Sequence, residues 1–143
     1  MRKMHRARKV YGVMAGLALV CTPFAAYAHH AFAAEFDADK PVKLRGVIKK
    51  MDWINPHTWM YIEVKEPDGT VTEWAIEGGA PNAMFRRGWN MNSIKPGIEV
   101  VVDGYRAKSG ENKANGRDVT LPDGKQLFMG SSGTGAPNDP TKK

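Results

Sequence analysis

The chain has 143 residues, with 21 Lys and Arg against 15 Asp and Glu, and a formal net charge of +6. Five of the basic residues and none of the acidic ones fall within residues 1–28, so the remaining 115 residues carry a net charge of only +1. The single cysteine, Cys21, falls in the same segment. Residues 29–143 therefore exclude a disulfide framework, a thiol nucleophile and a cysteine-based metal site. Their near-neutral charge argues against a nucleic-acid partner.

Residues 1–28 have the pattern of a secretory signal peptide. A positively charged start is followed by an apolar stretch over residues 10–21, which Pro23 interrupts. Ala26 and Ala28 then supply the small residues that precede a cleavage point. The apolar stretch is too short for a comfortable transmembrane helix, although an uncleaved membrane anchor is the alternative. We expect export to the periplasm, no stable membrane span after cleavage, and a mature chain that begins at His29.

The rest of the chain is typical of a small β-domain. Alternating apolar and polar residues and turn sequences predict strands at residues 42–54, 58–65, 70–77, 98–107, 116–121 and 125–129. Gly46 and Gly104 interrupt two of these strands, as a bulge or a bend does. A short helix is predicted over residues 81–87, with Pro81 in its first turn and Gly88 at its end. Residues 108–115 are expected to form a polar loop, and residues 130–143 a disordered tail.

This order of elements predicts one all-β domain over residues 29–129. A long first strand that bends at a glycine, and a helix between the third and fourth strands, are typical of an OB-fold-like barrel with five or six strands. A small β-sandwich is the alternative.

Three histidines, His29, His30 and His57, are the residues in the mature chain that best suit chemistry. A histidine at the first position chelates a metal through its α-amino nitrogen and its Nδ1 atom. A second imidazole, from His57 in the turn after the first strand, would complete a set of three nitrogens, with His30 as an alternate ligand. Such nitrogen-rich sites suit Cu(II). The competing interpretation is structural, with two solvated terminal histidines and one turn histidine.

Aromatic and sulfur side chains give a second, weaker metal hypothesis. Met51, Trp53, Trp59 and Met60 surround His57 in the sequence, and thioether and imidazole groups suit Cu(I). However, His57 and Met60 point to opposite faces of a regular strand. Core packing is therefore the simpler role for Trp53, Met60 and Trp74. Arg86 and Arg87 are interpreted as a solvated helix face, beside Trp89 at the end of the barrel.

Several segments together resemble an uncharacterised exported bacterial family, known as a domain of unknown function with an Asn-Pro-His motif. The resemblance covers about residues 29–129 and implies export and a single small β-domain, without an established activity. Ala31 departs from it, because a small hydroxyl residue is expected after the paired histidines. The segments that carry the resemblance are His29–Asp37, Lys40–Val42, Trp53–His57, Pro81–Asn82, Arg87–Trp89, Lys95–Gly97 and Gly104–Lys108.

These observations predict a periplasmic binding module without a catalytic role, whose partner is a metal ion or another periplasmic protein. The first hypothesis is Cu(II) binding by His29 and His57. The alternative is a scaffold that binds an envelope protein or glycan through its barrel face, using exposed aromatic residues such as Trp59 or Trp89. A copper-dependent oxidase shares the N-terminal histidine, but the short chain shows no substrate surface.

We predict that export removes residues 1–28. Expression of the whole chain in a Gram-negative bacterium, followed by intact-mass measurement of the periplasmic fraction, should give the mass of residues 29–143. Recovery of the full-length mass from the membrane fraction would contradict this prediction and identify an uncleaved anchor.

Overall fold

The computed structural model describes residues 32–92 and 94–130. The expected signal peptide, His29, His30 and all but the first residue of the expected tail lie outside these described residues.

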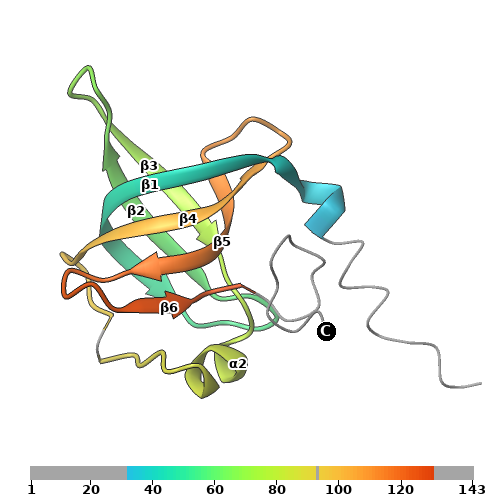
Figure 1. Cartoon of the computed structure of the whole chain (residues 1–143), viewed down its shortest axis with the longest axis vertical. Coiled ribbons are helices and arrows are strands. Elements are labelled where there is room, and N and C mark those ends of the chain that lie inside the picture. The colour runs from blue at the N-terminus through green and yellow to red at the C-terminus, as the bar shows by residue number, and fades with distance from the viewer. Residues whose placement is uncertain (1–31, 93, 131–143) are drawn as a thin grey trace, which may run out of the picture.

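The described chain contains six strands and one short helix after an initial helical turn at residues 32–35 (Figure 1). The elements are β1 (Phe36–Asp52), β2 (Trp59–Lys65), β3 (Val71–Glu77), α2 (Pro81–Arg86), β4 (Glu99–Ala107), β5 (Lys113–Thr120) and β6 (Gln126–Phe128).

The strands form a ring that identifies the fold as all-β and barrel-like. The sheet order is β3-β2-β1-β4-β5-β6, and a parallel pairing between β3 and β5 connects its two sides. Apart from this parallel pair, neighbouring strands run antiparallel. The ring β1-β2-β3-β5-β4, with α2 between β3 and β4, has the arrangement expected for an OB-fold-like barrel. It excludes the β-sandwich alternative.

The first strand is longer than the sequence indicated. β1 has 17 residues and begins at Phe36, six residues before the predicted start. Its pairing with β2 is irregular between Ile48 and Lys50, so the expected bulge is not at Gly46. Gly46 has a different role, because a Cβ atom there would lie 2.8 Å from the carbonyl oxygen of Glu63 on β2. A glycine thus allows the two backbones to approach at the bend.

Strand alternation explains the core. Met60 and Ile62 of β2, Ile76 of β3 and Val102 of β4 are completely buried and point into the ring. Side chains of opposite parity on the same strands face outward, as the period of two requires. The core thus confirms the packing role predicted for Met60, and Trp74 is buried with it.

Two glycines allow close approach near the closure of the ring, Gly104 where β4 pairs with β5 and Gly116 where β5 lies against β3. A Cβ atom on Gly104 would collide with the backbone oxygen of Asn115, and one on Gly116 would lie 2.8 Å from the Ile76 side chain. The pairing of β4 with β5 shifts between Asp103 and Gly104, so the bulge expected at this glycine is present.

Helix α2 covers one end of the ring. Pro81 occupies its first turn, and Gly88 follows it with φ +91°, a conformation that favours glycine. Met84 and Trp89 belong to the main core, and the Trp89 indole N–H donates to the Phe128 carbonyl at 2.8 Å.

Two expectations about polar segments were wrong. Residues 113–115 belong to β5 and not to a loop, because they pair with residues 75–77 of β3. Arg87 is not simply solvated, since its guanidinium donates to the Gly130 carbonyl and lies 4.8 Å from the centre of the Phe128 ring.

We predict that Gly104→Ala destabilises the domain by about 1–3 kcal/mol, because the added methyl group displaces the β5 backbone. Urea unfolding measures the change. The control is Val71→Ala on β3, where the side chain is 62% exposed and the change should stay within about 0.5 kcal/mol. Equal stability of Gly104→Ala and the wild type would contradict the tight closure.

Candidate functional site

His57 lies beside an ordered β-ladder. It precedes β2 in the connection from β1, and its side chain is 33% exposed. The hydrogen bonds of the β2–β3 hairpin continue past both strands, because Thr58 N donates to the Gly79 carbonyl at 3.0 Å and Gly78 N to the Thr58 carbonyl at 2.8 Å. The backbone of Thr58, directly after the histidine, is therefore fixed by both its N–H and its carbonyl group.

The two ring nitrogens of His57 have different surroundings. Nδ1 lies 3.2 Å from the Gly78 carbonyl oxygen and 3.5 Å from Oε1 of Glu77. In the tautomer with a proton on Nδ1, this nitrogen donates to the carbonyl, and Nε2 keeps its lone pair. Within the described residues, Nε2 has no hydrogen-bond partner. This is the arrangement in which a histidine binds a metal through one nitrogen while the other is oriented by an acceptor.

Glu77 is a buried carboxyl group next to this ring. It ends β3, opposite Trp59 of β2 and Asn115 of β5, and its side chain is only 10% exposed. The Asn115 amide nitrogen lies 3.5 Å from Glu77 Oε1. Burial raises the pKa of the Glu77 carboxyl above its ordinary value, and the nearby His57 acts in the opposite direction. Cross-strand neighbours share a sheet face, so Glu77, Trp59 and Asn115 lie on the same outer face of the ring.

A lysine connects this face to the beginning of the described chain. Lys113 Nζ forms an ion pair with Glu35, and it lies 5.0 Å from the centre of the Trp59 ring and 5.9 Å from that of Phe36. Glu35 and Lys113 also act on the Glu77 carboxyl, Glu35 raising its pKa and Lys113 lowering it. Residues 35 and 36 therefore lie close to the face that carries Glu77.

The residues just before β1 are anchored by packing and hydrogen bonds. Phe32 is 5% exposed, and its ring centre lies 5.8 Å from that of Phe36 and 5.6 Å from that of Tyr105. Lys108 N donates to the Glu35 carbonyl at 2.9 Å. The described chain thus begins at a buried residue with a defined position.

Only one of the three predicted histidine ligands can be placed. His57 is described, whereas His29 and His30 lie outside the described residues, so their approach to His57 stays a prediction. Residues 32–92 and 94–130 contain no group of three or more His, Cys, Asp or Glu side chains that could hold a metal ion.

Sequence reasoning missed Glu77, Asn115 and Lys113. The sequence indicated no role in the site for any acidic residue, and residues 113–115 were predicted to form a loop. The hairpin register offers a signal for Glu77, because the turn at Glu66–Gly69 sets Trp59 opposite Glu77 and so places the carboxyl beside His57. The pairing of Asn115 with Glu77 joins strands that are distant in sequence, and no local pattern predicts it.

The second metal hypothesis, built on methionine, receives no support from the geometry. Met60 is completely buried inside the ring, whereas Trp59 lies on the outer face. Trp89 is only 3% exposed, so it cannot serve as the exposed aromatic residue that the scaffold hypothesis required.

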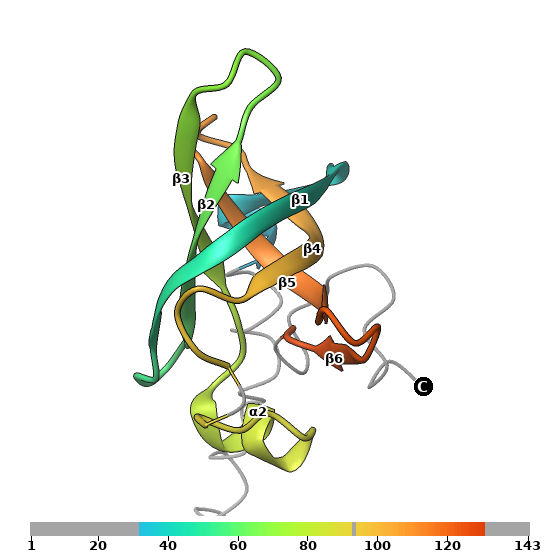
Figure 2. The same ribbon diagram turned by 90° about the vertical axis from the view of Figure 1, so that its left-hand side faces the viewer.

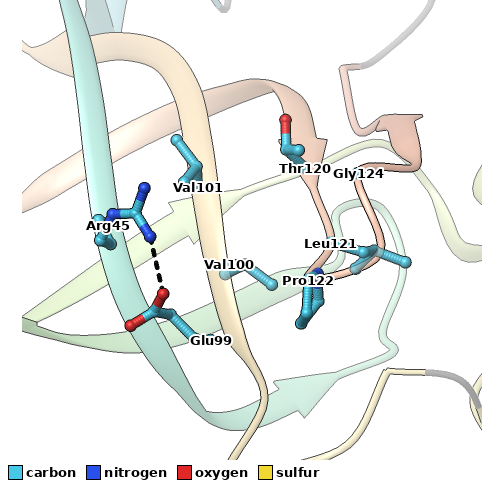
Figure 3. A pocket seen from close by; sticks show the side chains of 8 residues that line it. All are labelled: Arg45, Glu99, Val100, Val101, Thr120, Leu121, Pro122 and Gly124. Carbon is cyan, nitrogen blue, oxygen red and sulfur yellow. Dashed lines mark hydrogen bonds and ion pairs between the residues drawn. The ribbon is translucent and has the colours of Figure 1, made fainter.

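An open pocket of about 370 Å³ lies elsewhere, between β1, the start of β4 and the turn after β5 (Figure 3). Arg45 and Glu99 face each other at one side of it, 2.8 Å apart, and Thr120 and Pro122 line the other side. The two charges already pair with each other, so the pocket presents no unpartnered charge to a ligand.

We call the region formed by His57, Trp59, Glu77, Lys113 and Asn115 the His57 face. It belongs to a small all-β, barrel-like domain, and its partly exposed histidine is oriented by the Gly78 carbonyl and lies 3.5 Å from a buried carboxyl. The chain belongs to a family of unknown function, DUF6152, which matches residues 17–116. This match confirms the resemblance to an uncharacterised family. No curated protein matches the chain. Among the described residues, no helix is long and apolar enough to cross a membrane.

We predict that Glu77→Gln raises stability at neutral pH. Because the folded pKa lies above the ordinary 4.5, the folded chain retains a proton that the unfolded chain has released, and stability falls as pH rises from 4.5 to the raised pKa. The difference between the urea midpoints of Glu77→Gln and the wild type should therefore increase in favour of the variant as pH rises through this window. At higher pH the variant should keep the higher midpoint. Glu73→Gln, an exposed change on the same strand, is the control. An identical pH dependence in Glu77→Gln and wild type would contradict the buried charge.

Proposed function

We propose that this protein is a periplasmic copper-binding module. Export removes residues 1–28, and Cu(II) is held by the α-amine and Nδ1 of His29 together with Nε2 of His57. His30 is an alternate ligand. The role is carriage or sensing of the metal, without catalysis by the protein.

The orientation of His57 carries this proposal. Its Nδ1 lies 3.2 Å from the Gly78 carbonyl, so the ring is held and Nε2 keeps the lone pair that a metal requires. A buried carboxyl, that of Glu77, lies 3.5 Å from the same Nδ1 atom. Carboxylate neighbours of metal-binding histidines raise the basicity of the ring and compensate the charge of the cation.

The position of the chain before β1 also supports the proposal. His29 lies three positions before Phe32, a separation of at most about 10 Å when the chain is extended. Phe32 packs on Phe36, and Lys113 joins residues 35 and 36 to Trp59, two residues after His57. A processed amino terminus therefore has a short path to the His57 face.

The alternative is a domain that binds a macromolecular partner through its surface. The observation that favours it is a group of exposed apolar side chains near α2, including Phe85 and Met91, which are 41% and 58% exposed. This surface does not include His57, so the two functions are compatible and can be tested separately.

We predict a single EPR species when protein beginning at His29 receives one equivalent of Cu(II). This species, with well-resolved nitrogen coupling, should be present in the wild type and in His30→Ala, and lost in His57→Ala, which leaves only the two nitrogens of His29. Blocking the amine by a four-residue Gly-Ser-Gly-Ser extension should raise the Kd at least about tenfold, which corresponds to 1.4 kcal/mol. Extensions of one or two residues are avoided, because they place His30 or His29 third in the chain, where it forms a copper site with the amine and backbone amides.

Circular dichroism of each variant shows whether the fold is retained. A heterogeneous spectrum that is unchanged by His57→Ala would contradict the proposal, because it would identify a chelate confined to the terminal residues.

A further inference from the structure

A second surface, separate from the His57 face, combines exposed apolar residues with unpaired cations. We call it the α2 surface and define it by Ile54, Phe85, Arg86, Met91 and Lys95. Figures 1 and 2 show α2 at one end of the long axis of the molecule, with the tip of the β2–β3 hairpin at the other.

Aromatic ring contacts connect the chain segments that carry the apolar residues of the α2 surface. The Trp53 ring lies 5.0 Å from that of Phe85, in a stacked arrangement, and 6.3 Å from that of the buried Trp89. Ile54 follows Trp53 in the chain, and Met91 comes two residues after Trp89. The residues just after β1, helix α2 and the segment after α2 therefore meet at the rings of Trp53, Phe85 and Trp89.

The exposure of these residues is unusual for a soluble surface. Ile54 is 55% exposed, Phe85 41% and Met91 58%. They are three of the five large apolar residues that are exposed in the described part of the chain, and the other two, Val47 and Val71, lie on β1 and β3. Single exposed apolar residues need no explanation, whereas a group of them marks an interaction site.

The segment that carries Phe85 and Met91 is basic. Residues 78–98 contain three basic residues, Arg86, Arg87 and Lys95, and no Asp or Glu. Arg87 binds the Gly130 carbonyl, but Arg86 and Lys95 are exposed and form no ion pair within the described residues. A partner that complements this surface therefore carries negative charge and offers an apolar environment.

We propose that the α2 surface docks on an anionic lipid bilayer. Ile54, Phe85 and Met91 enter the interface between headgroups and acyl chains, and Arg86 and Lys95 contact the anionic headgroups. Apolar side chains beside basic residues are the pattern of peripheral membrane attachment. A bilayer accepts apolar side chains without a surface of matching shape. The side chains of the α2 surface project from a short helix and its adjoining turns, so this property favours a bilayer as the partner. This proposal does not rest on copper binding.

The test is co-sedimentation of the metal-free protein, recovered after export, with vesicles. Vesicles of phosphatidylglycerol and phosphatidylcholine should bind the wild type, and vesicles of phosphatidylcholine alone should not. The double variant Arg86→Glu/Lys95→Glu should have a partition coefficient at least about tenfold lower, since each cation near such a surface contributes to binding. Met91→Ser, which alters only an exposed side chain, should weaken it as well. High salt should release the protein.

The matched control is Val71→Ser, which removes an equally exposed apolar group from the other end of the molecule. Far-UV circular dichroism shows whether each variant is folded. Absence of vesicle binding by the wild type would overturn the proposal and leave an acidic protein as the remaining class of partner. Equal loss in Val71→Ser and Met91→Ser would overturn it too, because binding would then not be specific to the α2 surface.

Discussion

The parallel contact between β3 and β5 is the constraint on which the rest of this molecule depends. It joins only three residue pairs, from Ala75 with Lys113 to Glu77 with Asn115. Without it, the strands would form an open sheet with two free edges. Gly116 makes it feasible, since a side chain there would meet Ile76 of β3, and Gly104 allows β4 to approach the same part of β5.

Closure of the ring also assembles the His57 face. Glu77 comes from β3, Asn115 and Lys113 from β5, and Trp59 from β2. These residues share one outer face only because β5 returns beside β3. The same closure brings Phe36, which pairs with Ala107 at the end of β4, within reach of Lys113. A buried carboxyl, a partly exposed imidazole and the start of the domain thus become neighbours through topology.

Local patterns in the sequence account for much of this fold but only part of the site. Alternation in residues 59–65 and 71–77, together with the Pro67–Gly69 turn, was sufficient for the hairpin. Pro81 and Gly88 were sufficient for α2. The start of β1 was missed because residues 36–41 have few apolar residues, and they become a strand only by pairing with β4. Residues 113–115 were missed for the same reason, since their polar composition is that of a loop.

The histidine at position 57 could be recognised from the sequence because its neighbours form a turn between two strong strands. Its carboxyl partner could have been found by counting the hairpin register, which depends only on local sequence. Asn115 and Lys113 could not, because contacts between residues that are distant in the chain depend on how the ring closes. The α2 surface could be predicted in part. Its charge pattern is visible in the sequence, but the exposure of Phe85 and Met91 depends on how α2 and the segment after it pack against the core.

The β2–β3 hairpin offers a practical consequence for work in living cells. Its turn extends beyond the ring, and a side chain added at Gly69, at the tip, would meet no other atom within 4 Å. The strand that follows begins with Val71, which is mostly exposed. Loop tips of this kind tolerate inserted sequence. An epitope or a small fluorescent reporter placed between Asp68 and Gly69 would leave both ends of the polypeptide untouched, so that the protein could be followed with its processed terminus intact.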